Sequence, residues 1–158
     1  MKTCIYPGSF DPITMGHLDI IERGSQMFDE VIVCVLINTQ KEPSFSLEKR
    51  IEMIKKSVKH LKNVNVDAYN GLLVDFAKEN NASIILRGLR AVSDFENEFA
   101  MAATNKKLSD EIETVFLMTR TANLFLSSSM VREVAKLNGD ISSFVPPEIL
   151  DEVKASIR

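Results

Sequence analysis

Residues 3–17, TCIYPGSFDPITMGH, contain a short apolar run, then a turn, and then the start of an amphipathic pattern. This order of patterns indicates the fold class of the chain. Residues 3–6 are apolar and partly β-branched, which is typical of a strand buried on both faces. Gly8 and Gly16 bracket the turn, and apolar residues then recur at helical spacing from Leu18 to Phe28. The stretch predicts a strand, a turn that a ligand can approach closely, and a helix.

The same alternation continues along the chain. Four further short apolar runs predict strands at residues 31–37, 64–68, 83–86 and 114–118. Apolar residues three or four apart predict helices between and after these strands. Five strands separated by helices indicate right-handed crossovers and an α/β fold, a doubly wound five-stranded parallel sheet that is Rossmann-like, with helices on both faces.

No repeat or linker interrupts residues 1–158, so we expect a single domain. Ser93, with Glu96 three residues later, predicts a capping box at the start of the helix that carries Phe95 and Phe99. A C-terminal helix is expected after Pro146-Pro147.

Composition excludes several classes of function. The chain is 45% hydrophobic and 26% charged, and its net charge of −3 disfavours a general nucleic-acid or anionic-membrane binder. No segment has the roughly 18 consecutive apolar residues that a membrane span needs. Cys4 and Cys34 lie thirty residues apart in apolar runs, without paired Cys or His ligands, so we expect buried thiols, no metal site and a cytoplasmic protein.

The residues that follow the predicted strands are the place to look for a ligand, because parallel sheets bind ligands beyond the carboxyl ends of their strands. Ser9 and His17 follow the first strand, and an imidazole near a helix start can donate a hydrogen bond to a phosphate oxygen. The alternative is that His17 only caps its helix, and the sequence leaves both interpretations open. It also leaves open whether Asp11 shapes the turn or acts in the site.

Cations and hydroxyls follow the other strands. Arg87 and Arg90 flank Gly88 after the fourth strand, and guanidinium groups suit bidentate contacts with phosphate. Lys41 follows the second strand. Three serines at residues 127–129 precede a helix predicted near Met130, whose first turn carries Arg132. The chain therefore gathers phosphate-binding groups at one edge of the sheet, although it lacks the common phosphate-binding and dinucleotide-binding glycine motifs.

These residues carry a family resemblance. TMGH at residues 14–17 and SSSMVR at residues 127–132 resemble the two signatures of the nucleotidylyltransferase superfamily. YPGSFDPIT at 6–14, RGLR at 87–90 and FENE at 95–98 together resemble bacterial phosphopantetheine adenylyltransferases, and the similarity extends from about residue 3 to about residue 145.

The resemblance implies a reaction, a cofactor and partners. ATP and 4′-phosphopantetheine would give dephospho-coenzyme A and pyrophosphate with Mg²⁺ assisting, in a homohexamer whose site coenzyme A can also occupy as a feedback ligand. It implies catalytic roles for His17, Lys41 and Arg90. It implies phosphopantetheine contacts for Ser9, Lys41, Leu73 and Arg87. The implied ATP contacts are Ser9, Phe10, His17, Gly88, Leu89, Arg90, Glu98, Asn123, Leu124, Phe125, Leu126, Ser127, Ser128 and Ser129.

Such a reaction needs no general base or covalent intermediate, because the attacking phosphate is already anionic and catalysis comes from alignment and electrostatics. The chain departs from the family pattern at two places. The segment Asn38-Thr39-Gln40-Lys41 lacks the usual proline before the lysine, and Asn123 stands where relatives often carry an aromatic residue. Two alternatives stay open: a related transferase acting on nicotinamide mononucleotide or glycerol phosphate, and a catalytically silent nucleotide or coenzyme A sensor.

Overall fold

The computed structural model describes residues 1–157 and contains one five-stranded sheet in which every neighbouring pair of strands is parallel. The order across the sheet is β3-β2-β1-β4-β5. The strands are β1 (Thr3–Gly8), β2 (Glu30–Leu36), β3 (Val64–Tyr69), β4 (Ile84–Leu89) and β5 (Glu113–Met118). The predicted doubly wound, Rossmann-like sheet is confirmed.

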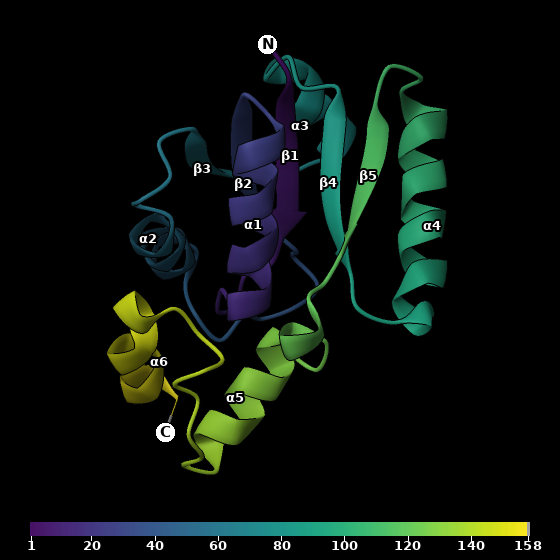
Figure 1. Cartoon of the computed structure of the whole chain (residues 1–158). Coiled ribbons are helices and arrows are strands. Elements are labelled where there is room, and N and C mark those ends of the chain that lie inside the picture. Colours follow the sequence, from purple (N-terminus) through teal and green to yellow (C-terminus); the bar gives the residue numbers. More distant parts are fainter. Residues whose placement is uncertain (158) are drawn as a thin grey trace.

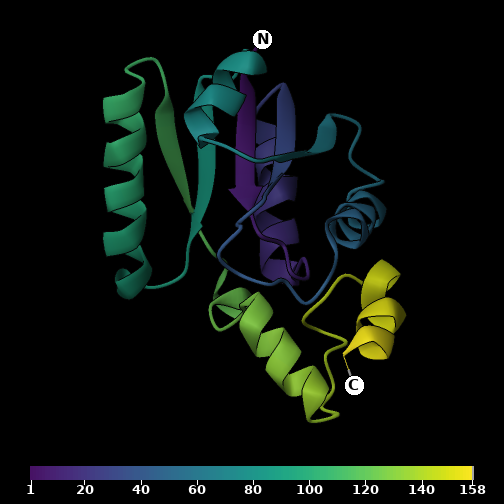
Figure 2. The same ribbon diagram turned by 180° about the vertical axis from the view of Figure 1, so that it is seen from behind.

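Six α-helices accompany the sheet: α1 (Met15–Met27), α2 (Leu47–Ser57), α3 (Leu73–Glu79), α4 (Val92–Leu108), α5 (Ser128–Lys136) and α6 (Leu150–Ser156). Two short 3₁₀ turns, η1 (Thr121–Asn123) and η2 (Pro147–Ile149), precede α5 and α6. Helices α1 and α2 cover one face, α3 lies behind the other, and α5 and α6 lie beyond the carboxyl ends of the strands (Figures 1 and 2). Within residues 1–157 no helix is long and apolar enough to cross a bilayer.

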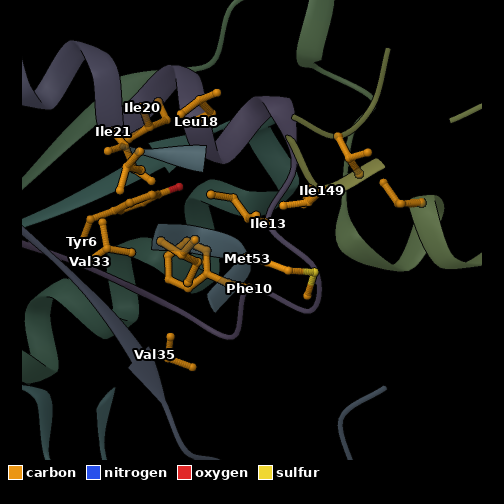
Figure 3. Packing of buried hydrophobic residues seen from close by; sticks show 14 of the residues in the cluster. Tyr6, Phe10, Ile13, Leu18, Ile20, Ile21, Val33, Val35, Met53 and Ile149 are labelled. Carbon is orange, nitrogen blue, oxygen red and sulfur yellow. The ribbon is translucent and has the colours of Figure 1, made fainter. Parts of the chain in front are cut away.

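Alternation of side chains along the central strands divides the core between the two faces. Cys4 and Tyr6 of β1 belong to the cluster under α1 and α2, whereas Ile5 belongs to the smaller cluster under α3. Phe10 and Ile13, from the turn after β1, extend the larger cluster away from the sheet (Figure 3). This turn is therefore part of the core, which limits how far its functional residues can move.

The predicted end of β4 and the predicted start of α4 were wrong. Strand β4 runs to Leu89, so Arg87, Gly88 and Leu89 are its last three residues rather than part of a following loop. The predicted Ser93–Glu96 capping box is absent, because α4 already begins at Val92 and its N-cap, Ala91, has no side-chain bond. Asp94 in the first turn instead accepts the backbone N–H of Arg90 at 3.3 Å, which fixes the earlier start.

Helix α4 differs from the other long helices because none of its residues is buried. Its apolar side chains were predicted to form one face, but Phe95 is 45% exposed and Phe99 is 59% exposed. The centroids of the two rings lie 5.7 Å apart. Helix α4 itself lies beside the edge strand β5 (Figures 1 and 2). The helix thus presents an apolar face that no other described element of the chain covers.

The turn after β1 is fixed by Asp11, whose side chain is buried. Its two carboxylate oxygens accept the backbone N–H groups of Ser44 and Phe45, each at 2.9 Å. Its carbonyl oxygen accepts a bond from Arg132 of α5 at 2.6 Å. Asp11 therefore shapes the turn and connects it to two distant segments, which is one of the two roles that the sequence left open.

We predict that Asp11→Ala lowers the free energy of unfolding by about 2–4 kcal/mol, because it removes charged hydrogen bonds and leaves the buried N–H of Phe45 without an acceptor. Urea denaturation followed by circular dichroism measures the change. Asp67→Ala is the control, since this exposed carboxylate accepts only the N–H of the adjacent Ala68, and it should change stability by less than about 0.5 kcal/mol. Equal losses in the two variants would contradict the role of Asp11.

Candidate active site

The direction of winding reverses between β1 and β4, which are neighbours at the centre of the sheet. Open α/β sheets bind ligands at this position, beyond the carboxyl ends of the two strands. A cavity of about 260 Å³ lies there, and it includes the end of β1, the start of α1, the end of β4 and the start of α5. Nine of the sequence-predicted residues line it: Ser9, His17, Arg87, Gly88, Arg90, Glu98, Leu126, Ser127 and Ser128.

His17 occupies the third position of α1, and its ring lies at the cavity. Its Nδ1 accepts the backbone N–H of Thr14 at 3.0 Å, while the Thr14 hydroxyl accepts the backbone N–H of His17 at 3.3 Å. Because Nδ1 is an acceptor, the neutral ring carries its proton on Nε2. His17 does cap its helix, as one interpretation of the sequence had it, and the cap leaves Nε2–H as the donor for a ligand.

The imidazole of His17 is neutral at physiological pH. Burial, together with the smaller effects of the charges of Arg90 and Arg87, lowers the pKa of His17 to about 4. The ring therefore offers a hydrogen bond without a positive charge. The edge-on contact with Phe10, at 5.0 Å between ring centroids, holds it in place.

Phe10 was predicted to contact ATP, but its side chain is buried in the core and does not line the cavity. A Cβ on Gly8 would lie 3.1 Å from the Phe10 ring, so the absence of a side chain at Gly8 makes room for that ring. Phe10 also has a φ of 47°, a left-handed conformation that costs energy for a non-glycine residue. Its side chain packs against His17, and the contact of Phe10 with ATP stays a prediction.

The two arginines of β4 are held differently. Arg87 makes a two-point ion pair with Glu98 of α4, at 2.8 and 2.5 Å, and donates to the carbonyl of Pro7 at 2.8 Å. Arg90 donates to the carbonyl of Leu126 at 2.6 Å and lies 3.3 Å from Asp94. Arg90 thereby connects the end of β4 to the segment before α5, and each of the two guanidinium groups at the cavity is paired with a carboxylate.

The three serines form the start of α5 two residues before the predicted position. Ser127 is the N-cap and accepts the N–H of Met130 at 3.1 Å, while Ser128 donates to the carbonyl of Pro12 at 2.7 Å. The Ser129 hydroxyl accepts a bond from Arg132 at 3.3 Å. The hydroxyls are therefore engaged, and within residues 1–157 the backbone N–H groups of Ser128 and Ser129 have no backbone acceptor. They are the groups that can receive a phosphate.

A second cavity of about 300 Å³ adjoins the first, since Ser9 and Ser128 line both. Lys41, from the loop after β2, lies on its exposed rim, and Arg132 and Ser129 line it from α5. Arg50 of α2 also lines it, although the sequence analysis did not single this residue out. Its position three residues after Leu47 and four before Ile54, on an apolar helix face, was the available sign.

The remaining predicted residues lie around these cavities. Leu73 begins α3 and shares a narrow cavity of about 40 Å³ with Arg87 and Glu98. Leu89 lines none of the three cavities. Asn123 lies in η1, and Leu124 and Phe125 are exposed. Phe125 packs edge-on against Phe144, with ring centroids 5.3 Å apart, so the C-terminal segment supports the loop before α5. Neither this contact nor the role of Thr14 was predicted from the sequence.

The described residues provide no protein cage for a metal ion. Residues 1–157 contain no group of three or more His, Cys, Asp or Glu side chains that could hold one. The two carboxylates of the first cavity, Asp94 and Glu98, are occupied by ion pairs with Arg90 and Arg87.

Comparison with known proteins gives the family. The family model for cytidylyltransferase-like proteins matches residues 5–134. A phosphopantetheine adenylyltransferase of Clostridium botulinum is 60% identical over 153 residues, covering 97% of this chain and 96% of the relative. The enzyme of that name from Heliobacterium modesticaldum is 57% identical and covers 95% and 89%, respectively.

The solved structures agree on the fold. A Vibrio parahaemolyticus protein named as a nicotinate-nucleotide adenylyltransferase has a TM-score of 0.69 and covers 100% of this chain and 98% of its own, at 17% identity. At that identity the likeness concerns the architecture alone. On the sequence similarity, the chain belongs to the phosphopantetheine adenylyltransferase family of nucleotidyltransferases.

Proposed function

We propose that the chain transfers the adenylyl group of ATP to 4′-phosphopantetheine, giving dephospho-coenzyme A and pyrophosphate in coenzyme A biosynthesis. The observation that carries this proposal is a neutral imidazole donor, His17 Nε2–H, in the first of two adjoining cavities that are lined with cations and free helix N–H groups. Relatives named for the same activity cover nearly the whole chain. The two cysteines, Cys4 and Cys34, are buried free thiols, which is consistent with a reducing compartment such as the cytoplasm. The use of ATP as a substrate fits the same location.

The proposed chemistry is a direct in-line attack of the acceptor phosphate on the α-phosphate of ATP. With a pKa of about 4, His17 is neither a cation nor a general acid at neutral pH, so its part is a hydrogen bond to an α-phosphate oxygen as charge develops there. Arg90 and Lys41 would stabilise the phosphates on either side of His17. The rigid turn after β1 would hold the imidazole in place without reorganisation.

We assign the substrates to the cavities by the residues that line them. The first cavity and the segment before α5 would take ATP, with its phosphates toward the free N–H groups of α5. Phosphopantetheine would place its phosphate near Ser9 and Lys41 and its arm toward Leu73 and Arg87, which share the narrow third cavity. Coenzyme A contains the same pantetheine arm, so we propose that it competes for this site.

Mg²⁺ would be bound by the phosphates of ATP rather than by side chains of the protein. The carboxylates at the first cavity are already paired with arginines, and the ion normally binds through nucleotide phosphates and water. Its contribution when bound would be to neutralise phosphate charge. We assign no protein ligand to it.

We further propose that the protein is a homohexamer and that α4 is part of its interfaces. The support is the apolar face of α4, on which Phe95 and Phe99 are exposed next to the edge strand β5. Monomeric proteins seldom expose such a face.

Pyrophosphate release tests the reaction. With ATP and Mg²⁺, we expect release with 4′-phosphopantetheine and none above background with nicotinamide mononucleotide or glycerol 3-phosphate. The measurement is a coupled pyrophosphate assay, with mass spectrometry to identify dephospho-coenzyme A. Release with another acceptor would assign a different transferase, and nucleotide binding without release would indicate a sensor.

We predict that His17→Ala lowers kcat by about 10²–10³-fold, because it removes a preorganised donor to the transition state. Steady-state kinetics measures the loss, and circular dichroism checks the fold. His60→Ala is the control, since that exposed histidine pairs with Glu22 on the surface and should leave kcat unchanged. The wild-type rate should also not depend on His17 protonation until the pH falls toward 4. A kcat unchanged by His17→Ala would remove His17 from the mechanism.

We predict that Phe99→Glu shifts the assembly to smaller species, because a charge on the apolar face of α4 opposes its burial between subunits. Light scattering coupled to size-exclusion chromatography gives the mass. Asn97→Glu adds the same charge to the same helix two residues away, on a different face, and should preserve the assembly. A wild-type protein of monomer mass would refute the hexamer.

A further inference from the structure

Arg50 is a buried cation without a counter-ion. Its side chain belongs to the first turns of α2, and the residue is only 5% exposed. It lies on the helix face that also buries Met53 and Ile54 in the core. An arginine in this setting is normally paired with a carboxylate, because burying an isolated charge is costly.

The bonds of Arg50 leave most of its donors unused. One terminal nitrogen donates to the carbonyl of Ser9 at 2.9 Å. Its Nε is buried and has no partner, and Arg50 forms no ion pair within residues 1–157. A guanidinium group carries five N–H donors, so one carbonyl does not satisfy it. This part of the fold therefore has a buried positive charge that no anionic group of the described residues neutralises.

The surroundings show where that anion can bind. Arg50 lines the second cavity together with Lys41 and Arg132, and the first turn of α5 reaches it through Ser128 and Ser129. The free N–H groups at the start of α5 add positive potential on the same side.

The carboxylates of the cavity do not cancel this charge. Both oxygens of Asp11 are bonded to backbone N–H groups, and Arg132 lies 3.7 Å from one of them. Glu42 is the other acidic residue of the lining, and it is exposed. Three cations thus face two carboxylates, of which one is already engaged.

We propose that Arg50 is a further binding residue of the active site, which contacts a phosphoryl group held in the second cavity. The inference rests on the proposed function and deepens it. The phosphoryl group is either the pyrophosphate end of ATP or the phosphate of the acceptor, since both are dianionic phosphates that a planar guanidinium can bind. The bond to Ser9 makes Arg50 a link between this phosphate and the turn that holds His17.

The Arg50→Met variant distinguishes a role of Arg50 in ligand binding from a role in the stability of the fold. The substitution replaces a buried, unpaired cation with an apolar side chain of similar length, and such replacements are often neutral or stabilising for the fold. We therefore expect the melting temperature of the free protein to be unchanged or higher. We expect the affinity for inorganic pyrophosphate, the affinity for 4′-phosphopantetheine, or both to fall about tenfold or more.

Isothermal titration calorimetry with each compound alone measures these affinities without turnover. A loss for pyrophosphate only assigns Arg50 to the leaving end of ATP, and a loss for 4′-phosphopantetheine only assigns it to the acceptor phosphate. Arg50→Lys keeps a charge without the planar fork, and it should bind the affected ligand with intermediate affinity. It also serves as the test if Arg50→Met does not fold.

Lys55→Met is the matched control, because it removes an exposed positive charge from the same helix and should leave both affinities unchanged. Unchanged affinities in both Arg50 variants would overturn the proposal, and so would a wild-type protein that binds neither compound. A wild-type protein that binds pyrophosphate in an Arg50-dependent manner but does not adenylylate 4′-phosphopantetheine would refute the proposed function and support the site.

Discussion

Asp11 joins three segments that are far apart in the sequence through its carboxylate and its backbone carbonyl, and the arrangement of the site depends on it. Its bonds to Ser44 and Phe45 hold the loop after β2, and the same residue receives Arg132 of α5. Without these bonds the loop that carries Lys41 would be more mobile, because loop backbones are fixed mainly by their contacts with the core. The position of Lys41 relative to the site would then be less well defined. One buried residue thus sets the relation between the turn that carries His17, the loop that carries Lys41 and helix α5.

The electrostatics of the site follow from the same packing. Several cations surround a small region at the carboxyl ends of β1 and β4, and the imidazole among them is kept neutral by burial and by Arg90 and Arg87. The capping contact with Thr14 then fixes which nitrogen donates. A neutral donor beside fixed cations suits a reaction between two anions, in which each partner must approach without a competing proton transfer. Arg50 adds a further buried positive charge to the site, and the described residues do not provide its counter-ion.

Much of the architecture was accessible from the sequence. Short β-branched runs in β1, β2 and β5 and the apolar spacing of α1 and α2 are local features, and each predicted an element that the structure contains. The rule for ligand position in parallel sheets then placed His17 and Arg90 at one cavity. The predicted capping box at Ser93 is absent because suitable residue types and spacing do not by themselves fix the start of a helix. In the structure Asp94 accepts the backbone N–H of Arg90, and α4 starts at Val92. Helix boundaries depend on such competing contacts.

The sequence by itself determined the alternation of strands and helices, the family motifs and the edge of the sheet at which cations gather, because these depend on local spacing and on a general rule of parallel sheets. Only the tertiary structure decided the structural role of Asp11, the engagement of Arg87 by Glu98, the exposure of α4 and the burial of Arg50. The physical reason is the same in each case. The energy of a charge or an apolar side chain depends on the atoms that the fold brings next to it, and for these residues most of those atoms come from segments distant in the chain.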